Sequence, residues 1–149
     1  MRVGPLDIDL PEDWQDRSLY TYVAPITDVS PSMAVRQTTF QTNVVFQQRR
    51  LEAGEGLEQC VERARQNTDG MFGGPKISIT DGPTADGIQF KRLTYTVVDG
   101  VTSQPVAQVL YVGRVGEREW QVAFSVAAIE LDAQIPAFDR MIASIRLSQ

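Results

Sequence analysis

The stretch that decides the fold runs from Val106 to Val126 and reads Val-Ala-Gln-Val-Leu-Tyr-Val-Gly-Arg-Val-Gly-Glu-Arg-Glu-Trp-Gln-Val-Ala-Phe-Ser-Val. Two runs rich in β-branched and aromatic residues, 106–112 and 119–126, flank a turn at Val115-Gly116-Glu117. Such a pattern predicts an antiparallel β-hairpin. We expect Gly113 to lie opposite Trp120, which pairs Tyr111 with Val122 and Val109 with Phe124.

Alternate residues of a strand share a face, so this register gives the hairpin two different faces. The bulky face, which also carries Trp120 and Val126, is expected to be core under the helices. The opposite face carries the candidate partner-binding residues Gln108, Leu110, Val112, Gln121, Ala123 and Ser125. Small and amide side chains among aliphatic ones suit a groove for an apolar helix, as in membrane-helix packing. A plain solvent face fits equally well, because a one-residue slip in register exchanges the faces.

Strand patterns recur on both sides of this hairpin. Alternation and β-branched content predict strands over 6–10, 19–23, 34–40, 43–49, 76–80 and 88–98, with the segments 34–40 and 43–49 forming either one bent strand or two. Turns are expected at Asp81-Gly82-Pro83 and Asp99-Gly100. The Gly-rich segment 70–75 lacks the spacing of a phosphate-binding loop and is interpreted as a connector.

Two segments show helical spacing. From about Gly56 to Asn67, apolar residues recur at Leu57, Cys60, Val61 and Ala64. Near the end of the chain, Asp132 is a candidate N-cap and Pro136 falls in the first turn, followed by the apolar positions Phe138, Met141, Ile142 and Ile145. The order of elements predicts one α+β domain over residues 1–149, a twisted, largely antiparallel sheet with helices packed against it.

The amino-acid composition limits the binding partners and the cellular compartment that we expect for this protein. With 14 basic and 19 acidic residues the net charge is −5, which disfavours nucleic acid and anionic membranes as partners. The basic pairs Arg49/Arg50 and Lys91/Arg92 are interpreted as solvated strand faces. The sequence has no run of the roughly 20 apolar residues that are needed to span a bilayer. Residues 1–10 also lack a secretory signal pattern. We expect a cytoplasmic protein, although a mature chain trimmed of its signal would have the same features.

The residue types argue against catalysis. The chain has no histidine, so neither a usual catalytic triad nor a His-containing zinc site can form. The single cysteine, Cys60, lies on an apolar helix face and is expected to be a core residue and not a nucleophile. We therefore expect no enzyme activity, cofactor or metal. An enzymatic alternative would need a pocket with convergent polar groups.

Two other groups of residues have a functional and a structural interpretation. The carboxylates Asp7, Asp9, Glu12 and Asp13 could bind calcium or share a proton, but without a calcium-loop spacing they are expected to be solvated. Trp14 and Trp120 could form a ligand cage, but core positions are favoured for large aromatics around a strand.

Three blocks of sequence resemble the DcrB-like family, whose fold is related to PsbP. The first is Ile8-Asp9-Leu10-Pro11-Glu12-Asp13-Trp14 through Ser18, similar to a strand followed by "LP-x-x-W" and "D-x-[ST]". The second runs from Asn43 to Glu58 and resembles a strand ending in a basic residue, then "L-x-x-G-x-x-L" before a helix. The third, Phe138 to Leu147, resembles the closing helix. The blocks follow the family order over nearly the whole chain.

This resemblance implies a PsbP-like fold and a role as a binding protein. Lacking a lipobox cysteine, the chain is more similar to the Eag chaperones of type VI secretion than to the lipoprotein members of the family. Such chaperones are implied to be cytoplasmic dimers that shield the hydrophobic N-terminal transmembrane segments of effectors before secretion. The alternative is an envelope-associated or regulatory protein-binding module of the same fold.

Overall fold

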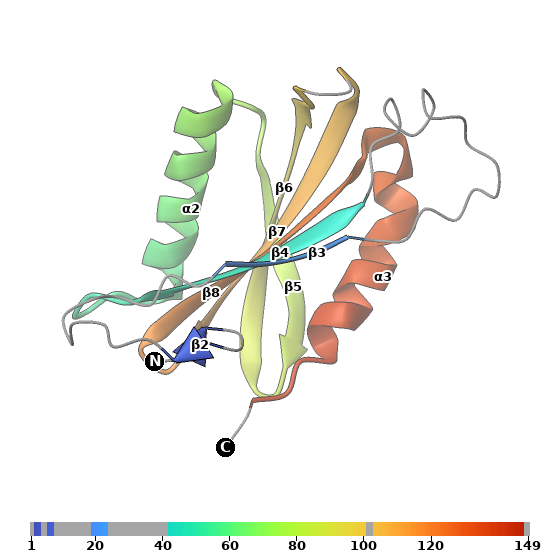
Figure 1. Ribbon diagram of the computed structural model, residues 1–149. Helices are drawn as coiled ribbons and strands as arrows, with labels where there is room; N and C mark the ends of the chain where they lie inside the picture. Colours follow the sequence, from blue (N-terminus) through green and yellow to red (C-terminus); the bar gives the residue numbers. More distant parts are fainter. Residues whose placement is uncertain (1, 4–5, 8–18, 24–41, 101–102, 148–149) are drawn as a thin grey trace.

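A six-stranded antiparallel sheet forms the centre of the protein in the computed structural model, which describes residues 2–3, 6–7, 19–23, 42–100 and 103–147 (Figure 1). The strand order is β3-β4-β8-β7-β6-β5. Their bounds are β3 Leu19–Val23, β4 Asn43–Arg50, β5 Ser78–Ala85, β6 Ile88–Val98, β7 Pro105–Val115 and β8 Arg118–Ala127. A separate two-stranded sheet pairs β1 (Arg2–Val3) with β2 (Leu6–Asp7). The expected largely antiparallel α+β architecture is confirmed.

The register of the β7–β8 hairpin is the one that the sequence predicts. Gly113 pairs with Trp120, Tyr111 with Val122 and Val109 with Phe124. The strands turn at Gly116, whose φ of +59° lies in the left-handed region that glycine adopts without steric cost. Since this register holds, the two predicted faces of the hairpin are also correct.

The bulky face packs beneath helix α3 (Leu131–Ala143), which follows a short 3₁₀ turn, η1 (Ala128–Glu130). Phe138 and Ile142 of α3 join the core residues Val109, Tyr111, Val122, Phe124 and Val126 in one apolar cluster. The rings of Phe124 and Phe138 stack with centroids 4.2 Å apart. Trp120 shares this face but is only partly buried, so it borders the core and does not close it.

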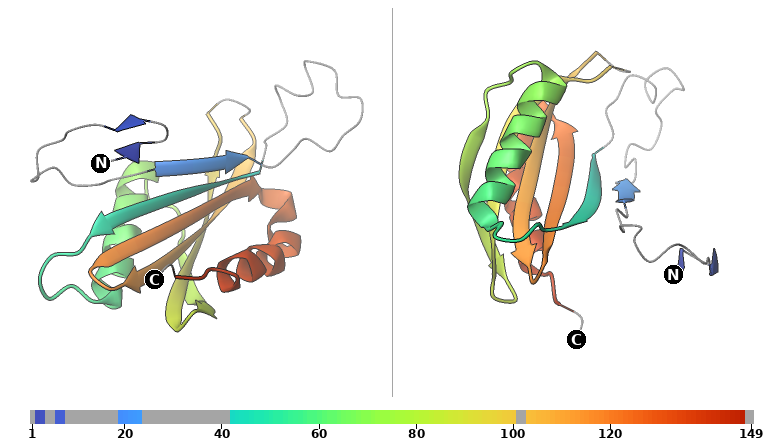
Figure 2. Two further views of the ribbon diagram at one scale, coloured as in Figure 1. Left: turned by 60° about the horizontal axis from the view of Figure 1, so that its bottom comes forward. Right: turned by 90° about the vertical axis from the view of Figure 1, so that its left-hand side faces the viewer.

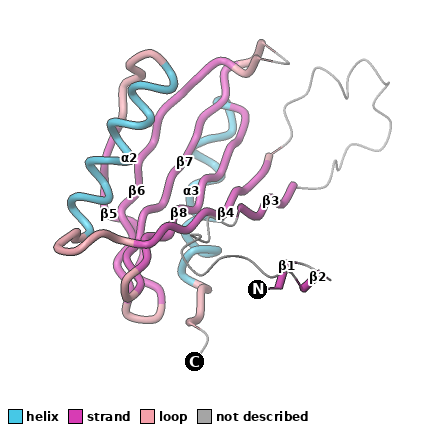
Figure 3. The backbone as a smooth tube through the Cα atoms, turned by 60° about the vertical axis from the view of Figure 1, so that its left-hand side comes forward, coloured by secondary structure: helices cyan, strands magenta, loops and turns pink. Residues whose placement is uncertain are grey.

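Helix α2 (Leu57–Phe72) lies on the opposite face of the sheet from α3 (Figures 2 and 3). Cys60, Val61 and Ala64 of α2 pack on Leu93 of β6 and on Leu110 and Val112 of β7. The expectation that the bulky face lies under both helices is therefore wrong. Helical apolar spacing shows that a helix packs on the sheet but carries no information about which face it covers.

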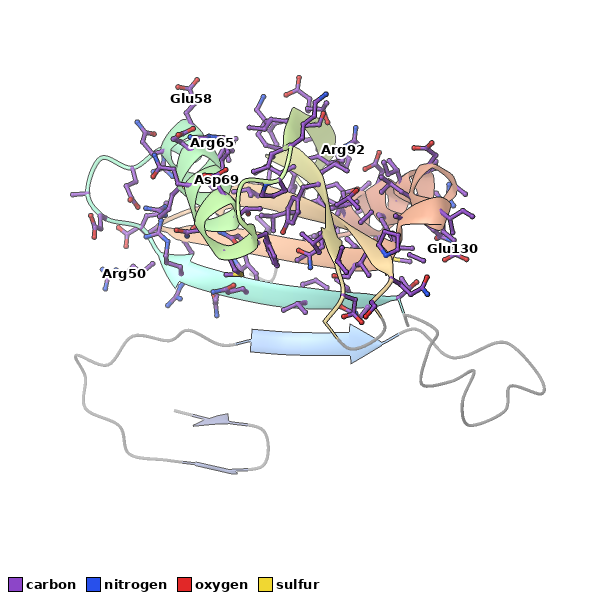
Figure 4. The ribbon with its side chains drawn as sticks, turned by 90° about the horizontal axis from the view of Figure 1, so that it is seen from above. Arg50, Glu58, Arg65, Asp69, Arg92 and Glu130 are labelled. Atoms are coloured by element: carbon purple, nitrogen blue, oxygen red, sulfur yellow. The ribbon has the colours of Figure 1, made fainter. Side chains whose placement is uncertain are left out.

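An ion pair and a hydrogen bond tie α3 to the sheet. Arg92 Nη1 donates to both carboxylate oxygens of Asp139, at 2.8 and 2.7 Å, and the Tyr111 hydroxyl donates to Asp139 Oδ1. Burial, together with Asp139, raises the pKa of Tyr111 well above its usual value, so the hydroxyl stays a donor. Arg92 lies beside α3 (Figure 4) and is not the solvated residue expected from the Lys91/Arg92 pair.

The turn between β5 and β6 does not lie at the predicted residues. The segment Asp81-Gly82-Pro83 lies inside β5, where the register shifts between Asp81 and Thr84. Pro83 is tolerated there because β5 is the edge strand. The turn is made instead by Asp86 and Gly87, both with positive φ (49° and 81°), as a two-residue Asp-Gly hairpin requires.

Both helices differ from their predicted limits. Helix α2 continues through Gly70 to Phe72 and ends at Gly73, which is left-handed with φ of 71°. The predicted connector 70–75 is thus partly helical, because a single glycine costs a helix only about 1 kcal/mol. Helix α3 has Glu130 and not Asp132 at its N-cap, which places Pro136 inside the helix and not in its first turn. The helix ends at Ala143, before Ile145.

Some predictions fall outside the described residues. These are the strand over 34–40, residues 8–10 of the first predicted strand, Trp14, and the carboxylates Asp9, Glu12 and Asp13. Asp7 lies in β2.

Replacing Gly113 by alanine should destabilise the fold. A Cβ there would lie 2.5 Å from Phe90 Cε1 and 2.7 Å from its Cδ1, and Phe90 is 2% exposed, so its ring has little room to move. We expect a loss of about 1–3 kcal/mol in the free energy of unfolding, measured by urea denaturation. Gly100→Ala is the control, because its Cβ would meet no atom within 4 Å. Equal midpoints for the two variants would contradict this packing.

Candidate functional site

A groove of about 580 Å³ lies between α2 and the part of the sheet that α2 leaves uncovered. The helix contacts β6 and β7, whereas β8 and β4 continue the same face beyond it. Residues of α2 from Arg63 to Phe72 form one wall, and alternate residues of β4, β8 and β7 form the floor. The groove is therefore a consequence of one helix covering only part of one sheet face.

Five of the six candidate partner-binding residues line this groove, namely Gln108, Leu110, Gln121, Ala123 and Ser125. The sixth, Val112, is fully buried beneath α2 in the apolar cluster around Cys60. The hairpin places them as cross-strand pairs, Gln108 with Ser125, Leu110 with Ala123 and Val112 with Gln121. Their role in binding stays a prediction, but five of them lie together on a concave surface.

The floor of the groove alternates amide and aliphatic side chains. Strand β4, which the sequence did not single out, adds Val45 opposite Ala123 and Gln47 opposite Gln121. The Tyr95 hydroxyl donates to Gln108 Oε1, which fixes that amide. An apolar ligand could therefore rest on the aliphatic positions while the amides bond to its polar groups.

Exposed apolar side chains stand at the rim near the end of α2. Met71 is 72% exposed and Phe72 is 37% exposed, and both line the groove. The Phe72 ring lies 5.7 Å from that of Tyr95. An exposed apolar side chain next to a concave surface is a better indication of a binding site than one on a flat surface, since it extends the apolar area that a partner can cover.

Four charged residues close the other end of the groove. Glu119 is only 1% exposed, and its Oε2 accepts from Arg49 Nε at 2.8 Å and lies 3.6 Å from Arg63 Nη2. Glu55 bonds both arginines from outside the groove, with its Oε2 3.1 Å from Arg49 Nη2 and its Oε1 accepting from Arg63 Nη1. Burial lowers the pKa of Arg49, but Glu119 and Glu55 outweigh it, so the net pKa is raised. The cluster joins β4, β8 and α2.

This cluster was not predicted from the sequence. Arg49 and Arg50 were expected to be one solvated pair, but strand alternation separates them. The Arg49 side chain is 25% exposed and ion-paired, whereas Arg50 is 69% exposed and lies at the end of β4 (Figure 4). Arg49 and Glu119 meet because they are cross-strand partners, 70 residues apart in the chain. The available signal was that Glu119 shares a face with Gln121 and Ala123.

Cys60 is a core residue, as expected. It is fully buried under α2, and burial, followed by the charge of Glu119, raises the pKa of its thiol to about 11. Within the described residues, no group of three or more His, Cys, Asp or Glu side chains could hold a metal ion. No helix in that part of the chain is long and apolar enough to cross a bilayer.

The architecture places the protein in a class of α+β proteins with a helix on each face of an antiparallel sheet. It is similar to a crystal structure from Pseudomonas aeruginosa, PA94, described as a protein of unknown function and a candidate regulator. The TM-score is 0.73 at 14% identity, over 100% of this chain and 96% of that chain. It is also similar to the solution structure of cyanobacterial PsbP (CyanoP) from Synechocystis sp. PCC 6803, with a TM-score of 0.57 at 12% identity, over 97% of this chain and 100% of that chain.

The second likeness shows a PsbP-like fold, as predicted from the sequence. No family model matches the chain, and no curated protein matches it either. Because both structural identities are low, the likenesses concern the fold alone. The narrower DcrB-like and Eag-type resemblance stays a prediction.

The buried thiol of Cys60 should be unreactive in the folded protein. At pH 8 a thiol with a pKa of about 11 carries almost no thiolate, and the thiolate is the form that reacts with alkylating reagents. We expect iodoacetamide to modify native Cys60 at least about a hundredfold more slowly than the same residue in 8 M urea. Mass spectrometry over time measures both rates. Similar rates would mean that α2 does not cover the thiol.

Proposed function

We propose that this chain is a non-enzymatic chaperone or adaptor that holds an apolar helical segment of a partner protein in the α2 groove. The observation that carries the proposal is the groove itself, whose concave floor mixes small, aliphatic and amide side chains beside exposed Met71 and Phe72. The resemblance to the Eag chaperones suggests the partner: the hydrophobic N-terminal transmembrane region of a type VI secretion effector.

The length of the groove suits a helix. Its floor follows β8 from Glu119 to Ser125, which at about 3.3 Å per residue is roughly 20 Å. A helix rises 1.5 Å per residue, so roughly 13 residues could lie along this floor. A segment of that size covers both the charged end and the aromatic rim, whereas a compact small molecule would reach only one of them.

The side chains of the groove suit an apolar helix in particular. Ala64, Ala123 and Ser125 are small enough for a helix backbone to approach closely, as small residues do between membrane helices. A transmembrane segment in water exposes apolar area that costs about 25 cal/mol per Å². Covering it in the groove would keep the partner soluble until secretion.

The remaining parts of the proposal concern location and assembly. We propose a cytoplasmic protein without stable membrane insertion, a homodimer, and a partner that is not nucleic acid, in line with the net charge of −5. No cofactor takes part.

A second candidate function is a regulatory or envelope-associated protein-binding module that uses the same groove. The observation that favours it is the likeness in fold to PA94, which is described as a candidate regulator. The two candidates differ in the partner and not in the surface, because both need a protein segment in the groove.

Filling the groove should abolish chaperone activity. Ala123→Trp places a large ring on the floor between Leu110 and Val45. Ala133→Trp is the matched control, since Ala133 is exposed on α3, on the other side of the sheet. Each variant is co-expressed with the type VI effectors of its own genome that have apolar N-terminal segments, and with a soluble carrier protein that bears a 20-residue Leu/Ala segment at its N-terminus.

We expect the unmodified chain and Ala133→Trp to keep at least one effector and the carrier fusion soluble and to co-purify with them. Ala123→Trp should lose at least about tenfold of the co-purified partner while retaining its circular dichroism spectrum. Co-purification with none of them would refute the chaperone proposal. Binding of the carrier fusion without any effector would favour the regulatory candidate.

A further inference from the structure

A second concave surface lies on the other face of the sheet, where the chain leaves α3. It is a pocket of about 520 Å³ between the sheet and the segment 145–147. The Leu147 N–H donates to Asp86 Oδ2 at 2.9 Å, which ties this segment to the turn between β5 and β6 (Figure 1). Residues of β4, β6, β7 and β8 form the rest of the pocket wall.

The lining of this pocket is almost entirely apolar. Eight of its nine residues have apolar side chains. Phe90 and Val122 are 2% and 1% exposed and form a buried base, whereas Trp120, Ile88 and Ile145 are partly accessible around it. An accessible apolar cavity of this size is typical of a small-molecule site.

Arg146 is the one charged residue that lines the pocket, and its side chain is exposed. Its Nη1 donates to the carbonyl oxygens of Ala143 and Ile145, at 3.0 and 2.9 Å, which holds the guanidinium at the end of α3. Within the described residues, its Nε and Nη2 make no hydrogen bond and the residue forms no ion pair. These two nitrogens form one edge of the guanidinium, and such an edge binds a carboxylate through two parallel hydrogen bonds.

A second arginine borders the pocket. Arg118 lies on the same strand face as Trp120, two residues away, and pairs across the hairpin with Val115. Its Nη1 donates to the neutral Gln48 Oε1 at 3.4 Å, and no carboxylate of the described chain forms an ion pair with it. Two arginines beside an apolar cavity give it a positive potential, which favours a ligand with a negative charge.

The carboxylates at this end of the sheet are engaged elsewhere. Asp86 accepts from the backbone of Leu147, and Glu117, at the turn between β7 and β8, forms an ion pair with Arg50. Neither of them lines the pocket. The ligand that fits is therefore an amphiphile with an apolar chain and one anionic group.

We propose that this pocket binds a medium-chain fatty carboxylate. The alkyl chain lies on the apolar base and replaces water at Trp120, and the carboxylate accepts from Nε and Nη2 of Arg146. The occupant is the free monomer and not a bilayer, because a net charge of −5 disfavours an anionic membrane surface. The site lies on the opposite face of the sheet from the α2 groove, so the inference is independent of the proposed function.

The test uses the full chain with hexanoate, octanoate and decanoate, each below the concentration at which it forms micelles. Calorimetry measures the dissociation constants. Each methylene that the pocket buries should lower the dissociation constant by about fourfold. Decanol is the matched neutral ligand, and we expect it to bind about fivefold to tenfold more weakly than decanoate, because it cannot pair with Arg146.

The fluorescence of Trp120 shows where the ligand binds. Decanoate should shift the emission to the blue, since it removes water from the indole ring. Trp120→Phe keeps an aromatic ring in the pocket wall, so this variant should still bind decanoate in the calorimeter but lose most of the emission shift. An unchanged shift in this variant would place the ligand away from Trp120 and refute the site.

Two pairs of variants test the pocket itself. Arg146→Gln should bind decanoate and decanol equally, whereas Arg140→Gln, the same change at a position outside the pocket, should keep the preference for decanoate. Val115→Trp fills the pocket and should abolish binding. Its control is Val98→Trp, because Val98 is 72% exposed at the end of β6 and does not line the pocket.

The outcomes decide this site without reference to the α2 groove. No binding of decanoate, or equal binding of decanoate and decanol to the unmodified chain, would refute it. Binding to phosphatidylglycerol vesicles without binding of the monomer would also refute it, since the occupant would then be a membrane surface. Should Arg146→Gln or Val115→Trp fail to fold, the two ligands and the Trp120 emission still decide.

Discussion

The register of the β7–β8 hairpin is the constraint on which the rest of the structure depends. With Gly113 opposite Trp120, Tyr111, Val122 and Phe124 all point toward α3, and Leu110, Ala123 and Gln121 all point toward α2. A slip of one residue would bury Gln121 under α3 and expose Phe124. Gly113 supports this register from the side, because Phe90 occupies the space where a Cβ would be.

The sequence was sufficient for the elements that depend on local patterns and insufficient for those that depend on tertiary contacts. The hairpin register followed from strand alternation and a glycine turn, and the closing helix from its apolar spacing. The turn between β5 and β6 was placed wrongly because two Asp-Gly pairs, 81–82 and 86–87, lie close together in this stretch and have similar local signals. The turn forms at Asp86-Gly87 because β5 pairs with β6 in the register that places these residues between the strands. That register cannot be inferred from the turn residues alone.

The candidate site also combines residues that the local sequence pattern predicted with residues that only tertiary contacts bring together. Five groove residues came from the two-residue period of the hairpin, whereas Val112 was misplaced because the position of α2 over β7 is not encoded in the hairpin. The charged end was missed for a similar reason. Arg49 and Glu119 become neighbours only when β4 pairs with β8, and Arg63 joins them only when α2 docks. Each residue taken alone has the features of an ordinary surface charge.

The same charged residues explain how a groove can persist in a small protein. On the α3 side, the large rings of Phe46 and Phe124 fill the space above the sheet, whereas Val45 and Ala123, one position away on the same strands, leave it open. An open apolar floor tends to collapse, since burying it is favourable. Glu119 holds Arg63 of α2 and Arg49 of β4 at one end of the groove, so α2 cannot slide over β8 without breaking a buried ion pair. Glu119, Arg63 and Arg49 thus hold α2 away from β8, and the same three residues make one end of the groove charged.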